Sequence, residues 1–418
     1  MKNNHTPEIR FPGYTGNWEE YKLGDIAEKV SVGIATSSSQ YFSHKSQGIP
    51  FIKNQNVKEN WIDSSDLEYI SREFDQANAT KRVREGDILT VRTGYPGLSA
   101  VVPKELEGAQ TFTTLITRLK KDTAIPEFIS AFINSDTGMK QILGMEAGGA
   151  QKNVNAGILK ELLIQLPSLE EQKKVSNFIK ELSNTIALHQ QKLTILKQTK
   201  QGFLQKMFPK EGESVPEVRF PGFTGEWEES ELGAVIENMY NGQTPSRFND
   251  ENWNGEINWL SSGELNRGVV TTTIEKITLT GQKDANLRIV PKGTFVMAIT
   301  GLEAAGTRGN CAMLSIDTTL NQSCMAIFPK ESVLDSVFLF QWYRKVGEEY
   351  GIRYTQGTKQ QSYNAELIKL LPIIVPKIEE QIKIGNFFKQ LDDTITLHQR
   401  ELDALKETKK AFLQKMFA

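Results

Sequence analysis

Hydrophobic residues recur in alternating steps of four and three over two long stretches, one near the middle of the chain and one at its end. The two series are Val175, Ile179, Leu182, Ile186, His189, Leu193, Leu196, Lys200, Phe203 and Met207, and Ile384, Phe388, Leu391, Ile395, His398, Leu402, Leu405, Lys409, Phe412 and Met416. A repeat of 3.5 residues over more than four heptads is typical of a coiled coil. We therefore predict two helices of roughly 60 Å, paired antiparallel along this helix seam.

The two helical stretches are copies of one another. Two blocks recur at an offset of 209 residues (376 minus 167), which is half of the 418-residue chain: 167–208 as 376–417, and 7–28 as 216–237. The inner modules between these blocks, 31–165 and 240–374, are much less alike. The chain is therefore a tandem duplication in which similar framing segments hold two diverged modules.

Each inner module has short apolar runs typical of strands and one longer helical pattern. The predicted strands are 49–52, 87–92, 98–102, 111–118 and 162–166 in the first module, and 257–261, 294–300, 323–328 and 370–375 in the second. The predicted helices are 126–143 and 333–350. The order matches between the modules, which indicates one α+β fold that has diverged.

These patterns divide the chain into two mixed modules and two spacer helices with an internal pseudo-two-fold repeat. The expected boundaries are 1–166 for the first domain, 167–208 for the first helix, 209–216 for a linker, 217–375 for the second domain and 376–418 for the second helix.

Two histidines lie near the centres of the two helical stretches. Antiparallel pairing of identical helices places His189 and His398 beside the pseudo-two-fold axis, so we predict that their imidazoles face each other in the helix seam. The alternative is that each is a tolerated polar residue of the seam.

Composition narrows the class of protein. The net charge is −2, and Lys plus Arg balance Asp plus Glu at 15 each in 31–165 and 13 each in 240–374, so any DNA surface must come from local clustering. No apolar run is long enough for a membrane span or a signal peptide, and we expect a cytoplasmic protein. The two cysteines, Cys311 and Cys324, are expected as core thiols, and no metal-ligand spacing occurs.

The usual catalytic patterns are missing from the sequence. Gly301 and Gly306 have P-loop spacing, but Thr307 and Arg308 replace the Lys-Ser/Thr pair that would bind phosphate and Mg²⁺. There is no dinucleotide or S-adenosylmethionine fingerprint and no Gly-x-Ser-x-Gly elbow. We expect this chain by itself not to be an enzyme.

Three motifs occur in both halves in the same order. They are Trp-Glu-x-x-x-Leu-Gly at 18–24 and 227–233, Pro-x-x-Glu-Glu-Gln at 167–172 and Pro376 to Gln381, and a helix ending in Phe-Leu-Gln-Lys-Met-Phe at 203–208 and 412–417. Together they resemble the specificity subunits of type I restriction-modification enzymes, over essentially the whole length. Trp18 and Trp227 are expected to pack in the protein interior rather than stack on bases.

The resemblance implies a non-catalytic subunit with two target-recognition domains, each reading one half of a bipartite, asymmetric site in double-stranded DNA. It also implies two modification subunits that use S-adenosylmethionine to methylate adenine at N6, and two restriction subunits that use ATP and Mg²⁺. The spacer helices would fix the gap between the half-sites, so that four added residues lengthen it by about 6 Å, or nearly two base pairs.

Base reading needs polar side chains on loops that reach base edges. The candidates in the first module are Lys53, Asn54, Gln55 and Asn56; Arg92, Thr93 and Tyr95; and Gln151, Lys152 and Asn153. The basic cluster Lys81, Arg82 and Arg84 either contacts phosphates or forms a solvated face. The candidates in the second module are Ser261, Ser262, Glu264 and Arg267; Thr300 and Arg308; and Thr358, Lys359, Gln360 and Gln361.

Two rival hypotheses remain. One is a non-catalytic coiled-coil scaffold whose modules bind proteins, which the balanced charge favours and the divergence of the modules opposes. The other is a self-sufficient methyltransferase-nuclease, which the chain length and the missing motifs oppose.

Overall fold

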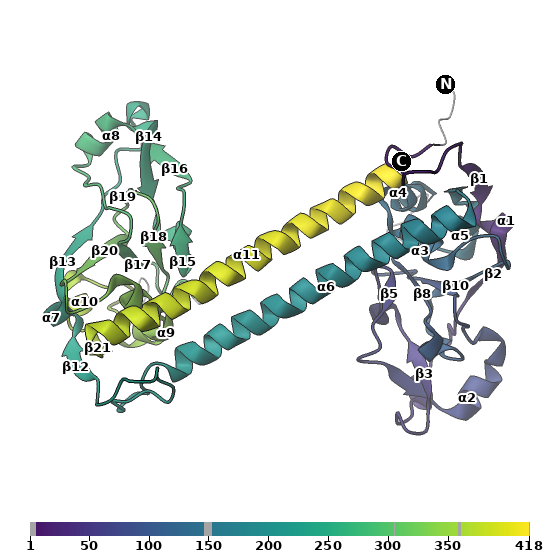
Figure 1. Cartoon of the computed structure of the whole chain (residues 1–418), viewed down its shortest axis with the longest axis horizontal. Helices are drawn as coiled ribbons and strands as arrows, with labels where there is room; N and C mark the ends of the chain where they lie inside the picture. The colour runs from purple at the N-terminus through teal and green to yellow at the C-terminus, as the bar shows by residue number, and fades with distance from the viewer. Residues whose placement is uncertain (1–5, 146–152, 305, 358–360, 418) are drawn as a thin grey trace. The chain divides into compact units, whose positions relative to one another are not determined.

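A computed structural model describes residues 6–145, 153–304, 306–357 and 361–417. The chain divides into two compact units, Met1–Gln191 with Arg400–Ala418, and Lys192–Gln399. The two long helices, α6 (Leu169–Lys206) and α11 (Ile378–Met416), each contribute one end to each unit (Figure 1). Each unit therefore consists of one inner module and a pair of helix ends.

The first unit is built from short strands and short helices besides the long ones. Its strands are β1 (Glu19–Lys22), β2 (Ala27–Val32), β3 (Ile49–Ile52), β4 (Val57–Lys58), β5 (Trp61–Ile62), β6 (Glu68–Ile70), β7 (Ile88–Thr90), β8 (Ser99–Val101), β9 (Gln110–Thr111), β10 (Leu115–Leu119) and β11 (Leu163–Leu166). Its helices are α1 (Leu23–Ile26), α2 (Arg72–Ala77), α3 (Pro126–Asn134), α4 (Asp136–Met145) and α5 (Ala156–Glu161).

The second unit has a similar inventory. Its strands are β12 (Glu228–Glu231), β13 (Ile236–Asn241), β14 (Trp253–Leu260), β15 (Gly268–Val270), β16 (Glu275–Ile277), β17 (Phe295–Ala298), β18 (Cys311–Leu314), β19 (Thr319–Leu320), β20 (Cys324–Pro329) and β21 (Pro372–Val375). Its helices are α7 (Leu232–Val235), α8 (Leu279–Asp284), α9 (Ser336–Arg353) and α10 (Ala365–Lys369).

The two modules share a common strand order, and the second module adds one edge strand, β15, to its larger sheet. In the first, the strand orders are β2-β10-β7-β8 and β6-β3-β9; in the second they are β13-β20-β17-β18-β15 and β16-β14-β19. The central strand of each smaller sheet pairs antiparallel with one neighbour and parallel with the other. The prediction of one α+β fold, duplicated and diverged, is confirmed.

A pair of glycines explains part of the shared topology. A Cβ on Gly33 would lie 2.4 Å from the Thr111 carbonyl oxygen, and a Cβ on Gly242 would lie 1.9 Å from the Leu320 carbonyl oxygen. The chain leaving β2 or β13 therefore passes directly against the end of β9 or β19, which only glycine allows.

Two predicted elements of the first module are interrupted. The predicted strand 111–118 is two strands, because Thr113 takes a φ of +57° and turns the chain between β9 and β10. The predicted helix 126–143 is α3 followed by α4, with extended backbone at Ser135, whose hydroxyl accepts a hydrogen bond from Gly138 N at 3.1 Å. Its counterpart α9 is continuous.

The repeated framing motifs form equivalent junctions between each module and the start of a long helix. Arg10 donates two hydrogen bonds to the buried Glu171 carboxylate at 2.7 and 2.8 Å, and Arg219 donates two to Glu380, both at 2.7 Å. The same guanidinium groups also donate to backbone carbonyls of the Thr-Gly turns. The Pro-x-x-Glu-Glu-Gln motif is thus a structural anchor.

Within each unit the helix ends run antiparallel. In the first unit Phe178 of α6 packs on Phe412 of α11, with ring centroids 4.8 Å apart. In the second unit Phe203 packs on Phe387 at 5.1 Å. Early residues of one helix thus meet late residues of the other, which confirms the predicted antiparallel coiled coil.

An aromatic residue just after the end of each long helix is buried in the core of a module. Phe417 packs edge-on against Phe128 at 5.2 Å in the first unit, and Phe208 packs against Phe338 at 5.4 Å in the second. Trp18 and Trp227 lie in these same cores, each 5.8 Å from the corresponding phenylalanine. Their predicted packing role is confirmed, and so is the prediction of free, buried thiols at Cys311 and Cys324.

The helix seam of the second unit contains an ionic triad in which Lys200 is buried and its two partners are half-buried. The Lys200 ammonium of α6 donates to Oδ1 of Asp392 on α11, and Arg344 of α9 donates to Oδ2 of the same carboxylate at 2.8 Å. Burial, with the nearby Arg344 charge, lowers the pKa of Lys200 to about 8. In the first unit the counterpart Lys409 instead pairs with Glu59 at 2.7 Å.

Candidate nucleic-acid interface

Loops from separate parts of the first module meet at one edge. β3 leads into a 3₁₀ turn at Asn54–Asn56, and β7 leads into the turn that begins at Arg92. Asn54 Nδ2 donates to Thr93 Oγ1 at 3.4 Å, and Val154 N donates to Arg92 O at 3.0 Å. The three candidate segments, which are far apart in sequence, are therefore neighbours, although Gln151 and Lys152 lie outside the described residues.

The side chains at this edge differ in what they can offer to a ligand. Gln55, Thr93 and Asn153 are exposed, and Tyr95 has 81% of its surface exposed. Asn56 is buried: its Oδ1 accepts from Lys53 N at 2.9 Å, and its Nδ2 donates to two carbonyls of the following loop. Asn56 therefore shapes the turn from which its neighbours project.

The basic cluster lies elsewhere in the module. Lys81, Arg82 and Arg84 precede β7, whereas the turn at Arg92 follows it, so the two groups lie at opposite ends of this strand. Arg82 donates to both carboxylate oxygens of Asp75. Burial opposes ionisation of Asp75, but the hydrogen bonds from Arg82 and Gln110 outweigh it and lower the pKa of this carboxyl. Arg84 is exposed.

The second module assembles a corresponding edge. Arg267 Nη2 donates to Arg308 O, and Arg308 Nη2 donates to Gln361 Oε1 at 3.4 Å. Leu302 N donates to Gln361 O at 3.1 Å, and Tyr363 N donates to Ile299 O at 2.9 Å, beside the exposed Thr300. The candidates Thr300, Arg267, Arg308 and Gln361 are thus brought together, while Thr358, Lys359 and Gln360 lie outside the described residues.

Glycines on α9 let the Arg308 loop approach closely. A Cβ on Gly351 would lie 3.1 Å from Cβ of Arg308, and a Cβ on Gly347 would lie 2.9 Å from the Gly309 Cα. The guanidinium is held further by donation to Glu303 O at 3.0 Å. A cationic, planar donor is therefore fixed at the edge, a group suited to guanine.

Glu264 has the same place in the second module as Asn56 in the first. Each ends a 3₁₀ turn, Asn54–Asn56 or Ser262–Glu264, and closes a capping box. Oε1 of Glu264 accepts from Ser261 N at 3.0 Å and from Ser261 Oγ at 2.9 Å, and Oε2 accepts from Ile274 N at 2.8 Å. The turns after β3 and β14 therefore share one internal brace and differ in their exposed residues.

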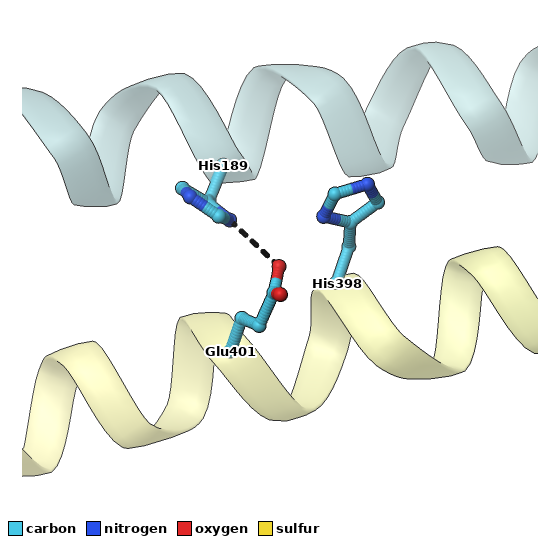
Figure 2. A group of neighbouring side chains, drawn as sticks. All are labelled: His189, His398 and Glu401. Carbon is cyan, nitrogen blue, oxygen red and sulfur yellow. Dashed lines mark ion pairs between the residues drawn. The ribbon is translucent and has the colours of Figure 1, made fainter.

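The predicted histidine pair in the helix seam joins residues of different units, and it stays a prediction. Within the first unit, His189 Nδ1 lies 3.6 Å from a carboxylate oxygen of Glu401 (Figure 2). Sequence reasoning missed this carboxylate, although it stands one helical turn after His398 on α11.

Comparison with known sequences decides the family. The sequence profile described as "Type I restriction modification DNA specificity domain" matches residues 15–198 and again residues 224–407. The chain belongs to this family. The two matches are offset by the same 209 residues as the internal repeat (224 minus 15). It is a type I restriction-modification specificity subunit with two target-recognition domains, and such subunits recognise DNA and are not catalytic.

Similar proteins match either most of this chain or a part of it. A Methanocaldococcus jannaschii protein provisionally named as the specificity subunit of the type I restriction enzyme MjaX is 24% identical over 418 residues, covering 95% of this chain and 92% of its own. The EcoR124I/EcoR124II specificity subunit of Escherichia coli is 25% identical over 169 residues, covering 40% of this chain and 41% of its own.

A solved structure supports the fold of this specificity subunit. The S subunit of a type I restriction-modification system from M. genitalium aligns with a TM-score of 0.64 at 13% identity, covering 99% of both chains. Within the described ranges, which omit 1–5, 146–152, 305, 358–360 and 418, no helix is long and apolar enough to cross a membrane.

Proposed function

We propose that the two modules read the two halves of one bipartite, asymmetric DNA target. The observation that carries this proposal is that the same sheet topology presents different side chains at the corresponding edges. The first edge offers amide and hydroxyl groups of Gln55, Thr93 and Asn153, whereas the second offers the guanidinium groups of Arg267 and Arg308. Such groups distinguish base pairs in the major groove, and different sets select different sequences.

The turn geometry supports this division of labour. Asn56 and Glu264 use their hydrogen-bonding atoms inside the protein, so the turn is kept while neighbouring positions vary. A fixed brace with variable neighbours is the arrangement that permits a new half-site without a new fold. We propose that the exposed residues named above contact the bases.

The paired helices are proposed to set the gap between the half-sites. α6 and α11 contain 38 and 39 residues, or about 57 Å of helix each. Inserting seven residues into both helices keeps the heptad phase and adds about 10 Å, which corresponds to about three base pairs. The expected result is a longer gap with unchanged half-sites, and altered half-site letters would refute this role.

The assembled complex is proposed to contain two modification and two restriction subunits. The duplicated Arg10–Glu171 and Arg219–Glu380 junctions support equivalent docking positions in the two halves. A similar solved chain, 20% identical with a TM-score of 0.52, comes from a study of complex assembly in the type I restriction-modification system. S-adenosylmethionine, ATP and Mg²⁺ would be bound by the partner subunits, for methylation of adenine at N6 and for restriction.

A module exchange tests the proposed function. Residues 31–165 are replaced with the matching module of another specificity subunit, and the chimera is expressed with its modification subunit. Mapping N6-methyladenine should show one half of the motif changed and the other half kept. Protein-binding modules on a scaffold would instead leave the methylated motif unchanged.

A further inference from the structure

The hairpin loop at the candidate edge of the second module is longer than its counterpart in the first. Residues 299–310 join β17 to β18, whereas residues 91–98 join the corresponding strands β7 and β8, so the second loop is four residues longer. The arginine of the shorter loop, Arg92, stands near its start, while Arg308 stands near the end of the longer loop. The placement of Arg308 is therefore a feature of the second module alone.

The first atoms of the Arg308 side chain are fixed against α9. A Cβ on Gly351 would lie 3.1 Å from Cβ and 3.2 Å from Cγ of Arg308. The next residue in the loop, Gly309, has a φ of +70°, and a Cβ there would lie 2.7 Å from the Glu348 backbone nitrogen. These glycines let the loop backbone and the arginine stem rest on the helix, which reduces the side-chain entropy lost when the guanidinium binds a ligand.

The guanidinium of Arg308 is oriented by neutral acceptors. Its Nη2 donates to Glu303 O at 3.0 Å and to Gln361 Oε1 at 3.4 Å. Over the residues that the structure describes, Arg308 forms no ion pair with a carboxylate, whereas Arg247 of the same module forms two hydrogen bonds to Glu275. Arg308 is also half-buried, so its charge is held in a fixed place and is left for acceptors that a ligand supplies.

The surroundings of Arg308 favour a base edge over a phosphate. Glu303, on the same loop, is exposed, and its Oε2 accepts a hydrogen bond from Gln361 N at 3.2 Å. A carboxylate at this place repels a phosphate, but in the major groove it can accept a hydrogen bond from the amino group of cytosine. The planar guanidinium beside it matches the O6 and N7 acceptors of guanine. The two groups together therefore suit G·C base pairs.

We propose that Arg308 reads a guanine in the half-site of the second module, by donating two hydrogen bonds to O6 and N7 in the major groove. Gly351 is a positioning residue, because it seats the stem of Arg308 on α9. This inference rests on the proposed DNA-reading function and names one base that the second half-site contains. The methylated motif should therefore have one G·C position that depends on Arg308.

The test uses the full chain with its modification subunit and maps the N6-methyladenine motif for the unaltered chain and its variants. The second half-site is the one that is kept when residues 31–165 are exchanged. Arg308→Ala should make one G·C position of this half-site degenerate and leave every other position unchanged. Arg308→Gln should shift the same position toward A·T, because a glutamine amide matches adenine. Both variants should bind the original target about 10- to 100-fold less tightly, as expected for loss of one bidentate base contact.

Two further variants separate a base contact from a general loss of charge. Gly351→Ala keeps the guanidinium but displaces its stem, so it should weaken discrimination at the same base pair as Arg308→Ala. Lys292→Ala is the matched control. Lys292 is exposed and precedes β17, whereas the Arg308 loop follows β17, so this variant removes a positive charge at the opposite end of the strand and should keep the motif and the affinity.

The outcomes distinguish the guanine contact from the function on which it rests. The contact would be overturned if Arg308→Ala selected the same motif as the unaltered chain, or if the unaltered second half-site contained no G·C pair. Uniformly weaker binding to all sequences, with a smaller slope of log affinity against log salt, would also overturn it, because that pattern belongs to a phosphate contact. An unaltered complex that selected no motif at all would overturn the proposed function itself.

Discussion

Replacing Lys200 with methionine should make the second unit more stable at neutral pH. Lys200 is 7% exposed in the helix seam, where it shares the Asp392 carboxylate with Arg344. Methionine has a similar shape and requires no desolvation of a charge, while Arg344 still neutralises Asp392. Replacing a buried ion by a packed apolar side chain is often stabilising by about 1–4 kcal/mol.

The lowered pKa of Lys200 predicts how the free energy of unfolding changes with pH, and by how much. Burial lowers the pKa of Lys200 from 10.5 to about 8, so the unfolded chain binds more protons than the folded chain between these pH values. The free energy of unfolding should therefore rise with pH across this window. Between pH 7 and pH 10, titration of Lys200 should raise the free energy of unfolding by about 2.5 kcal/mol. This rise should be absent from Lys200→Met.

The assay is equilibrium urea unfolding of the full chain, with a short hydrogen-exchange pulse read by mass spectrometry for peptides of each unit. Lys200→Met should be more stable than the unaltered chain by about 1–3 kcal/mol at pH 7 in the second unit, and the difference should shrink toward pH 10. Asp392→Asn leaves two adjacent cations without their anion and should cost about 3–5 kcal/mol at pH 7.

The repeat provides the matched control. Lys409 occupies the position equivalent to Lys200 in the first unit, but its partner Glu59 is partly exposed, with 47% of its side chain accessible. Lys409→Met should change the stability of the first unit by about 1 kcal/mol or less. The reasoning would be refuted if the difference in free energy of unfolding between Lys200→Met and the unaltered chain did not change between pH 7 and 10. A Lys200→Met variant that is clearly less stable at pH 7 would also refute it.

Four other substitutions test the packing of the framing motifs and strands, each by the same peptide-resolved unfolding. Phe417→Ala should destabilise only the first unit and Phe208→Ala only the second, each by about 3–5 kcal/mol, because each ring fills the core of one module. Glu171→Gln should cost the first unit about 3 kcal/mol, because the mostly buried Arg10 loses its anion. Gly242→Ala should cost the second unit about 2 kcal/mol or more, since its Cβ would lie 1.9 Å from a carbonyl oxygen.

The duplication made much of the fold predictable. The heptad repeat appears directly in the spacing of apolar residues such as Ile179 and Leu193. The helices that it predicted extend over Leu169–Lys206 and Ile378–Met416. Matching order in the two halves predicted the common topology of the modules. These features depend on periodicity, which the sequence displays directly.

The interruptions in the first module could not be read from the pattern. The run 111–118 has the apolar content of one strand, and only the left-handed backbone at Thr113 divides it. The break at Ser135 likewise depends on a close backbone approach, because a Cβ on Gly138 would lie 2.3 Å from the Phe132 carbonyl oxygen. Both boundaries depend on backbone conformation at single residues, which the apolar pattern does not report.

The sequence indicated which loops lie together, but not which of their side chains are exposed. The sequence selected loops that the structure brings together, but it could not show that Asn56 points inward while Gln55 is exposed. The sequence also did not show that Arg82 pairs with Asp75, seven residues earlier.

The most direct test of the account is the methylated sequence that this chain selects. Cells that express the chain with its modification subunit should carry N6-methyladenine within a single bipartite motif, with two different half-sites separated by a fixed gap. The motif should disappear when this chain is omitted. Methylation without a motif that depends on this chain, or a motif with only one half-site, would contradict the account.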